Sequence, residues 1–159
     1  MRTANFVLAS VAILLVSLHA RAATDEQLGY DPAADPFTQL AHAKAQAAAD
    51  HKLILLVAGG DWCSWCHYLN AFIKRNPDVE QALESTFVVV HVNYSEENKN
   101  EPFFATLPKA AGYPHFWVLS GGGELLKSQN TSPLENGNKG YEKTRFVAFI
   151  DEWKAKLDR

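Results

Sequence analysis

Both cysteines of the 159-residue chain lie in one short stretch, Cys63-Ser64-Trp65-Cys66. An apolar run from Leu53 to Ala58 precedes the stretch, two glycines interrupt that run, and a helical pattern follows. At a helix N-terminus, unpaired backbone N–H groups and the positive end of the helix dipole stabilise a thiolate, which lowers a cysteine pKa from about 8.5 towards 3.5–7.5. A buried strand, a glycine break and a Cys-x-x-Cys pair that opens a helix therefore predict a redox-active site.

The position of each cysteine on this helix predicts its role. We expect Cys63 to lie exposed at the helix terminus and to act as the attacking sulfur. Cys66, one turn further in, is placed to resolve the mixed disulfide and to release the substrate thiol. The two cysteines are expected to form a disulfide with each other in the oxidised protein.

The stretch around the pair, Trp62-Cys63-Ser64-Trp65-Cys66-His67, resembles the thioredoxin superfamily. The signature of that superfamily is an aromatic residue before Cys-x-x-Cys, placed between a central strand and a long helix. The resemblance runs from about Phe37 to Leu157. It implies an α/β fold, namely a three-layer sandwich in which helices flank a central mixed sheet of about four strands. It also implies thiol-disulfide oxidoreductase activity with no organic cofactor and no metal.

The resemblance further implies a cis-proline beside the cysteines. Pro114 matches it by position, because it precedes the strand predicted over His115 to Leu119. A cis bond would turn the backbone so that the preceding residue offers its N–H and C=O groups to an extended substrate. The alternative is a trans proline that starts a strand, since few X-Pro bonds are cis. We expect Trp62, Tyr113 and Pro114 to bind the substrate.

One feature of the superfamily is missing from this chain. Thioredoxin itself carries a buried acidic residue that helps to deprotonate the resolving cysteine, and the matching position, six before Cys63, is Val57. Asp61 and His67 are the nearest titratable candidates for that relay, unless His67 points to solvent. Ser64 and Trp65 are expected to tune the redox potential, which for dithiol proteins of this kind spans roughly −270 to −120 mV.

Other interpretations of the cysteine pair stay open. A structural disulfide would close a very short loop and would restrict the unfolded chain little. Zinc would need further ligands from scattered histidines. The run from Cys63 to His67 also satisfies the Cys-x-x-Cys-His motif of covalent haem attachment, although the preceding strand, the lack of any methionine beyond Met1 and the α/β pattern downstream disfavour it. A last hypothesis is a thioredoxin-fold module that holds a peptide or partner in a Tyr113-Pro114 groove, with incidental cysteines.

The first 22 residues predict a secretory signal peptide. Arg2 is the positive start, Phe6 to Leu18 is the apolar core, and Ala20-Arg21-Ala22 is a small-x-small cleavage site. The apolar run is shorter than the roughly 20 residues of a spanning helix, so we expect cleavage rather than a membrane anchor. The mature protein is therefore expected to be exported, to the periplasm if the source is bacterial and to the outside otherwise.

Charge and length limit the partners of the mature chain. Loss of residues 1–22 removes two arginines, which leaves 137 residues with 13 basic and 18 acidic side chains and a net charge of −5. An acidic chain without a basic run disfavours nucleic acid and anionic membrane surfaces as partners. We expect a monomer that exchanges disulfides with protein or small-molecule thiols and with a separate redox partner.

Hydrophobic periodicity predicts the order helix, strand, helix, helix, strand, strand, strand, helix over a single domain, residues 37–159. Asp35-Pro36 offers an N-cap and a proline at the first helical position. Residues 23–36 are expected to be an unstructured lead-in. Helices are expected over 37–50, from Cys66 through Ile73, from Pro77, and over 141–157. Strands are expected over 52–58, 87–92, 115–119 and 124–129, with solvated loops over 94–102 and 130–140 and an irregular helical turn over 103–110.

Overall fold

Asp35 begins the first helix, as the sequence predicts. Its carboxylate accepts hydrogen bonds from the amides of Phe37 and Thr38, and helix α1 (Pro36–Asp50) follows with proline in its first turn. The computed structural model describes residues 28–157. The predicted signal peptide over residues 1–22 lies outside the described residues.

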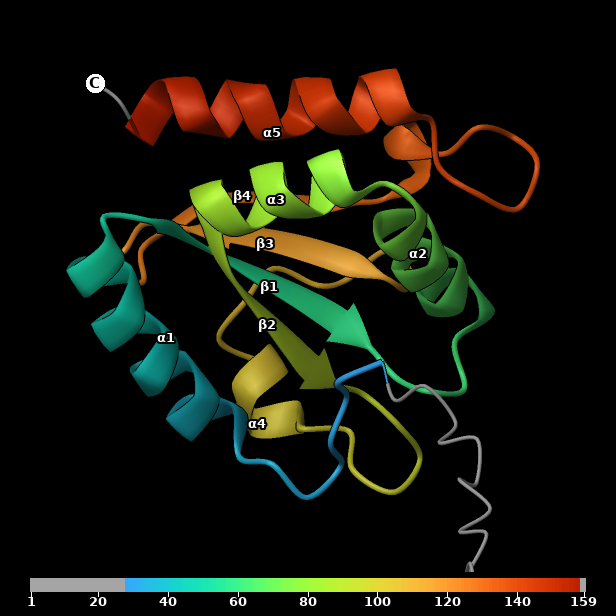
Figure 1. Cartoon of the computed structure of the whole chain (residues 1–159). Coiled ribbons are helices and arrows are strands. Elements are labelled where there is room, and N and C mark those ends of the chain that lie inside the picture. The colour runs from blue at the N-terminus through green and yellow to red at the C-terminus, as the bar shows by residue number, and fades with distance from the viewer. Residues whose placement is uncertain (1–27, 158–159) are drawn as a thin grey trace, which may run out of the picture.

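Four strands form the central mixed sheet (Figure 1). They are β1 (Leu53–Gly59), β2 (Phe87–Asn93), β3 (His115–Leu119) and β4 (Leu125–Asn130). Their order is β2-β1-β3-β4, with β1 parallel to β2 and β3 antiparallel to both β1 and β4. All seven residues of β1 are buried, which explains its continuous apolar sequence. The predicted α/β class and four-stranded mixed sheet are confirmed.

Helices cover the two faces of this sheet (Figure 1). Helices α2 (Ser64–Arg75), α3 (Pro77–Thr86) and α5 (Lys143–Leu157) lie on one face, and α1 and the short α4 (Glu101–Phe104) lie on the other. Side chains of β1 alternate between the two cores: Leu55 and Val57 join the α2/α3/α5 side, whereas Leu56 and Ala58 join the α1/α4 side. The result is the predicted three-layer sandwich.

Two connecting segments differ from the prediction. The helical turn expected over 103–110 is instead α4, which begins at Glu101, where Pro102 suits the first turn of a helix, and already ends at Phe104. The loop that follows β2 is hydrogen-bonded rather than merely solvated, since the side chain of Asn93 donates to the carbonyl of Asn98 at 2.9 Å. The later loop also contains a 3-10 turn, η1 (Ser132–Leu134). The Asn93 contact fixes the loop at the carboxyl end of β2.

The lead-in to α1 is packed, which corrects the expectation of an unstructured segment for its described part. Residues 28–35 form neither helix nor strand, yet Leu28 and Tyr30 are each only 6% exposed and join the core on the α2/α3/α5 side. The ring of Tyr30 meets the ring of His91 edge to face, with 5.0 Å between centroids. Burial of these two apolar side chains favours the ordered segment.

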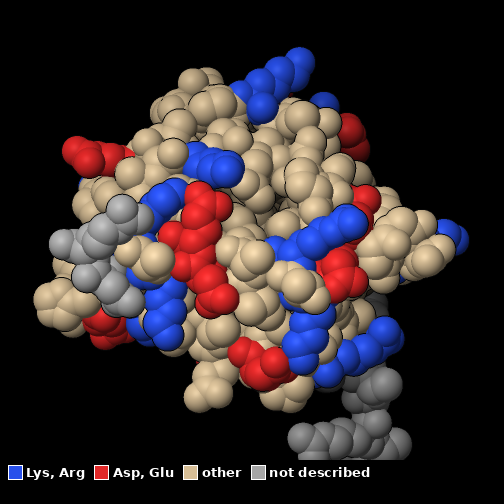
Figure 2. All heavy atoms as spheres, turned by 90° about the horizontal axis from the view of Figure 1, so that it is seen from above, with Lys and Arg blue, Asp and Glu red and all other residues tan. Residues whose placement is uncertain are grey.

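Both signs of charge mix on the face that carries α5 (Figure 2). Oppositely charged side chains of α2, α3 and α5 form the ion pairs Lys74–Glu80, Lys143–Asp78 and Lys156–Glu152. This face therefore lacks the one-signed surface that attracts nucleic acid. Within residues 28–157, no helix has both the length and the apolar character needed to cross a membrane.

Candidate active site

Cys63 and Cys66 form a disulfide at the N-terminus of α2. Cys63 is the N-cap residue, and its sulfur accepts a hydrogen bond from the backbone amide of Cys66 at 3.2 Å. Cys66 itself lies in the first turn of the helix. The helix N-terminus thus directs an N–H group at the Cys63 sulfur, where it favours a thiolate.

Neither cysteine is exposed in this oxidised state. Cys63 is 3% exposed and Cys66 is 2% exposed, so the expectation of an exposed Cys63 is wrong here. The reason is that the N-cap side chain folds back over the first turn and is tied to Cys66, which packs in the core. The two sulfurs are similarly buried and differ in their hydrogen bonding, because the Cys63 sulfur accepts a bond from the helix amide.

The structure brings the cysteine loop next to the Pro114 loop. Trp62, which is 56% exposed, packs edge to face against the ring of Tyr113, with 5.7 Å between centroids. The peptide bond between Tyr113 and Pro114 is cis, Pro114 is buried, and β3 begins at the next residue. Of the three residues expected to bind substrate, Trp62 and Tyr113 therefore pack together next to the cysteine loop, and the buried Pro114 follows Tyr113 in the chain.

Tyr94 completes this surface and was missed in the sequence. Its ring stacks on Tyr113 with 4.8 Å between centroids, and its carbonyl accepts a 2.6 Å hydrogen bond from the indole N–H of Trp62. Phe104 follows, with its ring 5.8 Å from that of Tyr94. We call Trp62, Tyr113, Tyr94 and Phe104 the aromatic row.

Burial, with Tyr94 as a further cause, raises the pKa of Tyr113 to about 12. The signal for Tyr94 is its place just beyond a strand parallel to β1, since such strand ends share one sheet edge.

The residues expected to tune the redox pair do not contact one another in a single group. The Nε2–H group of His67 donates to the backbone carbonyl of Asp61 at 2.7 Å, which holds the exposed ring on the loop before the helix. Ser64 is exposed. Trp65 is half-buried and packs edge to face against Tyr141, with 6.0 Å between centroids.

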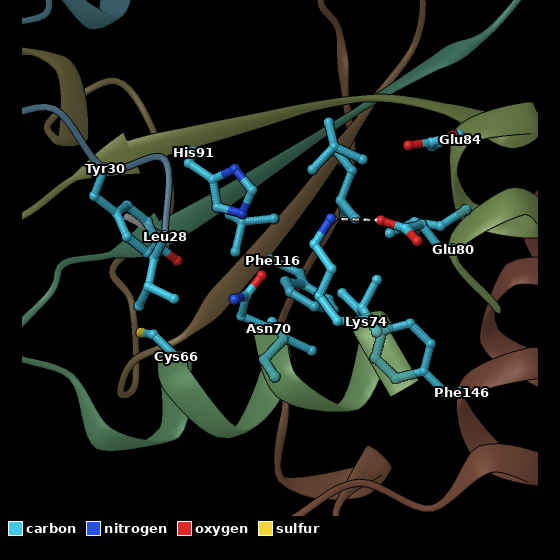
Figure 3. Close-up of a pocket in the computed structure, with 16 residues that line it drawn as sticks. Leu28, Tyr30, Cys66, Asn70, Lys74, Glu80, Glu84, His91, Phe116 and Phe146 are labelled. Atoms are coloured by element: carbon cyan, nitrogen blue, oxygen red, sulfur yellow. Dashed lines mark hydrogen bonds and ion pairs between the residues drawn. The ribbon is translucent and has the colours of Figure 1, made fainter. Parts of the chain in front are cut away.

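A cavity of about 230 Å³ lies behind Cys66 (Figure 3). Tyr30 and His91 line it together with Val57, the position where thioredoxin has an acid. Burial lowers the pKa of His91 and raises the pKa of Tyr30, so both side chains are neutral at about pH 7. Neither residue carries a local functional signal in the sequence, because Tyr30 lies in the lead-in and His91 continues an ordinary strand pattern.

The geometry does not suit haem attachment. The two thiols that would bind haem are joined to each other and buried, and the Nε2 atom of His67 is engaged by Asp61. His67 also does not line the cavity that reaches Cys66. Within the described part of the chain, no group of three or more His, Cys, Asp or Glu side chains is arranged to hold a metal ion.

Comparison with known proteins agrees with this architecture. A family model described as thioredoxin-like matches residues 35–121, which is more than half of the chain. No curated protein matches the chain.

Two crystal structures resemble the whole domain. One is a disulphide isomerase from Xylella fastidiosa Temecula1, with a TM-score of 0.66 and 26% identity over 82% of this chain and 96% of that chain. The other is the oxidised C-terminal domain of DsbD from Neisseria meningitidis, with a TM-score of 0.54 and 19% identity over 77% of this chain and 96% of that chain, a likeness of fold alone. On the evidence of the family model, the chain belongs to the thioredoxin-like family.

Proposed function

We propose that this protein is an exported thiol-disulfide oxidoreductase that works through Cys63 and Cys66. The observation that carries the proposal is the disulfide at the N-terminus of α2, in which the Cys66 amide donates to the Cys63 sulfur. Its likeness to a disulphide isomerase at 26% identity supports the same chemistry. The enzyme class therefore rests on both the fold and the redox pair.

Each exchange proceeds by attack of a thiolate on a disulfide, through a mixed disulfide between enzyme and substrate. A substrate thiolate attacks the Cys63 sulfur, the Cys63–Cys66 bond breaks, and its electron pair stays on the Cys66 sulfur as a thiolate. A second substrate thiolate then attacks the substrate sulfur of the mixed disulfide and expels Cys63 as a thiolate. The substrate leaves oxidised and the enzyme is reduced, and the reverse sequence reduces a substrate disulfide. The amide hydrogen bond to Cys63 favours its thiolate in both directions.

The aromatic row offers a binding surface for the substrate. Trp62 lies beside Cys63 in sequence and is exposed, while Tyr113 lies beside Pro114. A peptide bound at the Cys63 sulfur is expected to contact the exposed ring of Trp62, the residue before it in the chain. The expected substrates are therefore protein or small-molecule thiols and disulfides, and a separate redox partner would restore the enzyme.

Export is the part of the proposal that depends on residues 1–22. Their charge, apolar core and small-x-small site are typical of a secretory signal, and a disulfide persists best in an oxidising compartment. N-terminal sequencing of the protein recovered from the exported fraction should begin at Ala23. A chain that starts at Met1 inside the cell would contradict export without affecting the redox chemistry.

Reduction of insulin by dithiothreitol tests the activity. We expect the mature protein to accelerate the reaction and Cys63→Ser to abolish the acceleration, while Gln81→Ala, a change at an exposed position of α3, keeps it. If the wild-type protein is no faster than Cys63→Ser, oxidoreductase activity is wrong.

A binding module is the second candidate, and the aromatic row favours it because it offers an exposed ring that needs no redox turnover. In that case a peptide would bind equally well to the wild-type protein and to a Cys63→Ser/Cys66→Ser double variant, and neither protein would reduce insulin.

A further inference from the structure

We propose that the hydroxyl group of Tyr30 stabilises the Cys66 thiolate during disulfide exchange. The inference rests on the proposed function, because it assigns a hydrogen-bond donor to the sulfur that leaves when the Cys63–Cys66 bond opens. Tyr30 comes from the packed lead-in before α1, far from the cysteines in sequence. The lead-in would then be part of the active site.

Gly59 shows how close the two groups lie. A Cβ atom placed on Gly59 would be 2.5 Å from the Cys66 sulfur and 2.8 Å from the Tyr30 hydroxyl oxygen, so these two atoms are no more than 5.3 Å apart. Because residue 59 is a glycine, it places no side chain between the sulfur and the hydroxyl oxygen. The cavity beside them allows the freed sulfur to turn towards the oxygen, or a water molecule to bridge them.

The Cys66 thiolate needs such a donor because it forms inside the core. Cys66 is 2% exposed, and burial disfavours the charged form of a thiol. The amide N–H of the first helical turn is directed at the other sulfur, that of Cys63. A hydroxyl donor behind Cys66 would stabilise the second thiolate, since a hydrogen bond to an ionised acceptor is stronger than one between neutral groups.

Tyr30 is held in the protonated form that can donate. Its side chain is 6% exposed, and its ring is fixed by the edge-to-face contact with His91. Burial raises the pKa of the Tyr30 hydroxyl far above its usual value, with smaller contributions from Tyr141 and Asp61. The hydroxyl group therefore keeps its proton throughout the pH range in which a thiol ionises.

The other titratable groups that line the cavity bring no net positive charge to the Cys66 sulfur. Figure 3 shows Tyr30 near Cys66 at one end and Lys74 paired with Glu80 towards the other. The Lys74–Glu80 pair spans 2.9 Å and carries no net charge. Burial lowers the pKa of His91, so its neutral imidazole brings no positive charge to the cavity, although it keeps one N–H group. Glu84, the remaining acid on the lining, is exposed and comes from α3.

The test is the pKa of Cys66 in the full mature chain with Cys63→Ala, in which Cys66 is the single cysteine. Ultraviolet absorbance of the thiolate is followed across pH, and Tyr30→Phe, which keeps the ring, is compared with the parent. We expect Tyr30→Phe to raise the pKa of Cys66 by about 1 unit, the size expected for a lost hydrogen bond to a charged group. The matched control is Tyr68→Phe, which removes a hydroxyl group from α2 and should leave that pKa unchanged.

A folded Tyr30→Phe variant with an unchanged Cys66 pKa would overturn the proposal. Should that variant fail to fold, ¹³Cζ-tyrosine labelling of the Cys63→Ala protein gives the answer, because the Tyr30 resonance must shift as Cys66 ionises and a constant resonance overturns the proposal. Neither measurement depends on turnover. Failure of the wild-type protein to reduce insulin would therefore contradict the proposed function alone.

Discussion

The indole N–H of Trp62 donates to the backbone carbonyl of Tyr94 at 2.6 Å. This bond joins the loop before Cys63 to the segment after β2, and the ring of Tyr113 packs against both residues. Three segments that are distant in sequence therefore hold an exposed indole ring in one orientation beside the disulfide.

Trp62→Ala should weaken substrate binding more than stability. The KM for reduction of a peptide disulfide should rise by about 10-fold or more, since an aromatic anchor at an interface contributes about 2 kcal/mol. The urea midpoint of unfolding should change little, because the side chain is 56% exposed. Trp62→Phe keeps a ring but loses the hydrogen bond to Tyr94, so its KM should lie between those of the wild type and Trp62→Ala. An unchanged KM in the alanine variant would show that the aromatic row does not bind substrate.

Cys63 should be the nucleophile and Cys66 the resolving thiol. The Cys66→Ser variant should accumulate mixed disulfides with substrates, whereas Cys63→Ser should trap few, because the helix amide favours the Cys63 thiolate. In the reduced wild-type protein, iodoacetamide at mildly acid pH should label Cys63 first, which peptide mass spectrometry can determine. Faster labelling of Cys66 would reverse the assignment.

Gly59→Ala should destabilise the fold, because the new methyl group would lie 2.5 Å from the Cys66 sulfur and 2.8 Å from the Tyr30 oxygen. Overpacking of this kind costs about 1–3 kcal/mol, to be measured as a fall in the free energy of unfolding in urea. Gly112→Ala is the matched control, because its Cβ would meet nothing within 4 Å. Equal stability of the two variants would contradict the close approach at Gly59.

Asp35 should make stability depend on pH. Its hydrogen bond with the side chain of Thr38 is the main cause that lowers the pKa of the carboxyl group in the folded protein. The stabilisation is therefore present above the pKa of the unfolded chain and is lost as pH falls through the lower folded pKa. Urea unfolding of the wild type and of Asp35→Asn, which still caps but does not titrate, should show a small wild-type advantage at neutral pH. That stability difference should vanish in acid. A difference that persists at acid pH would show that the charge of the Asp35 carboxylate is not its cause.

The protein should remain free of haem. Expression with a haem-attachment system should give no Soret band in the visible spectrum, because the thiols are buried and His67 is engaged by Asp61. Covalently bound haem on Cys63 and Cys66 would overturn this interpretation of the site.

Much of the domain could be predicted because its signals are local. The N-cap at Asp35, the apolar run of β1 and the cysteine pair at the start of α2 are each encoded by adjacent residues. Capping, periodicity and the Cys-x-x-Cys spacing act over one or two turns of chain, so they remain visible without a structure.

The sequence by itself therefore determined the α/β layers, the redox pair and its helix terminus. Only the tertiary structure decided that Tyr30 faces Cys66, that Tyr94 completes the aromatic row and that the oxidised Cys63 is buried. The physical reason is that these contacts join residues far apart in the chain, and no periodic or spacing pattern in the sequence links such residues. A tyrosine in a polar lead-in resembles a surface residue in the sequence, and only its packing against His91 of β2 buries it.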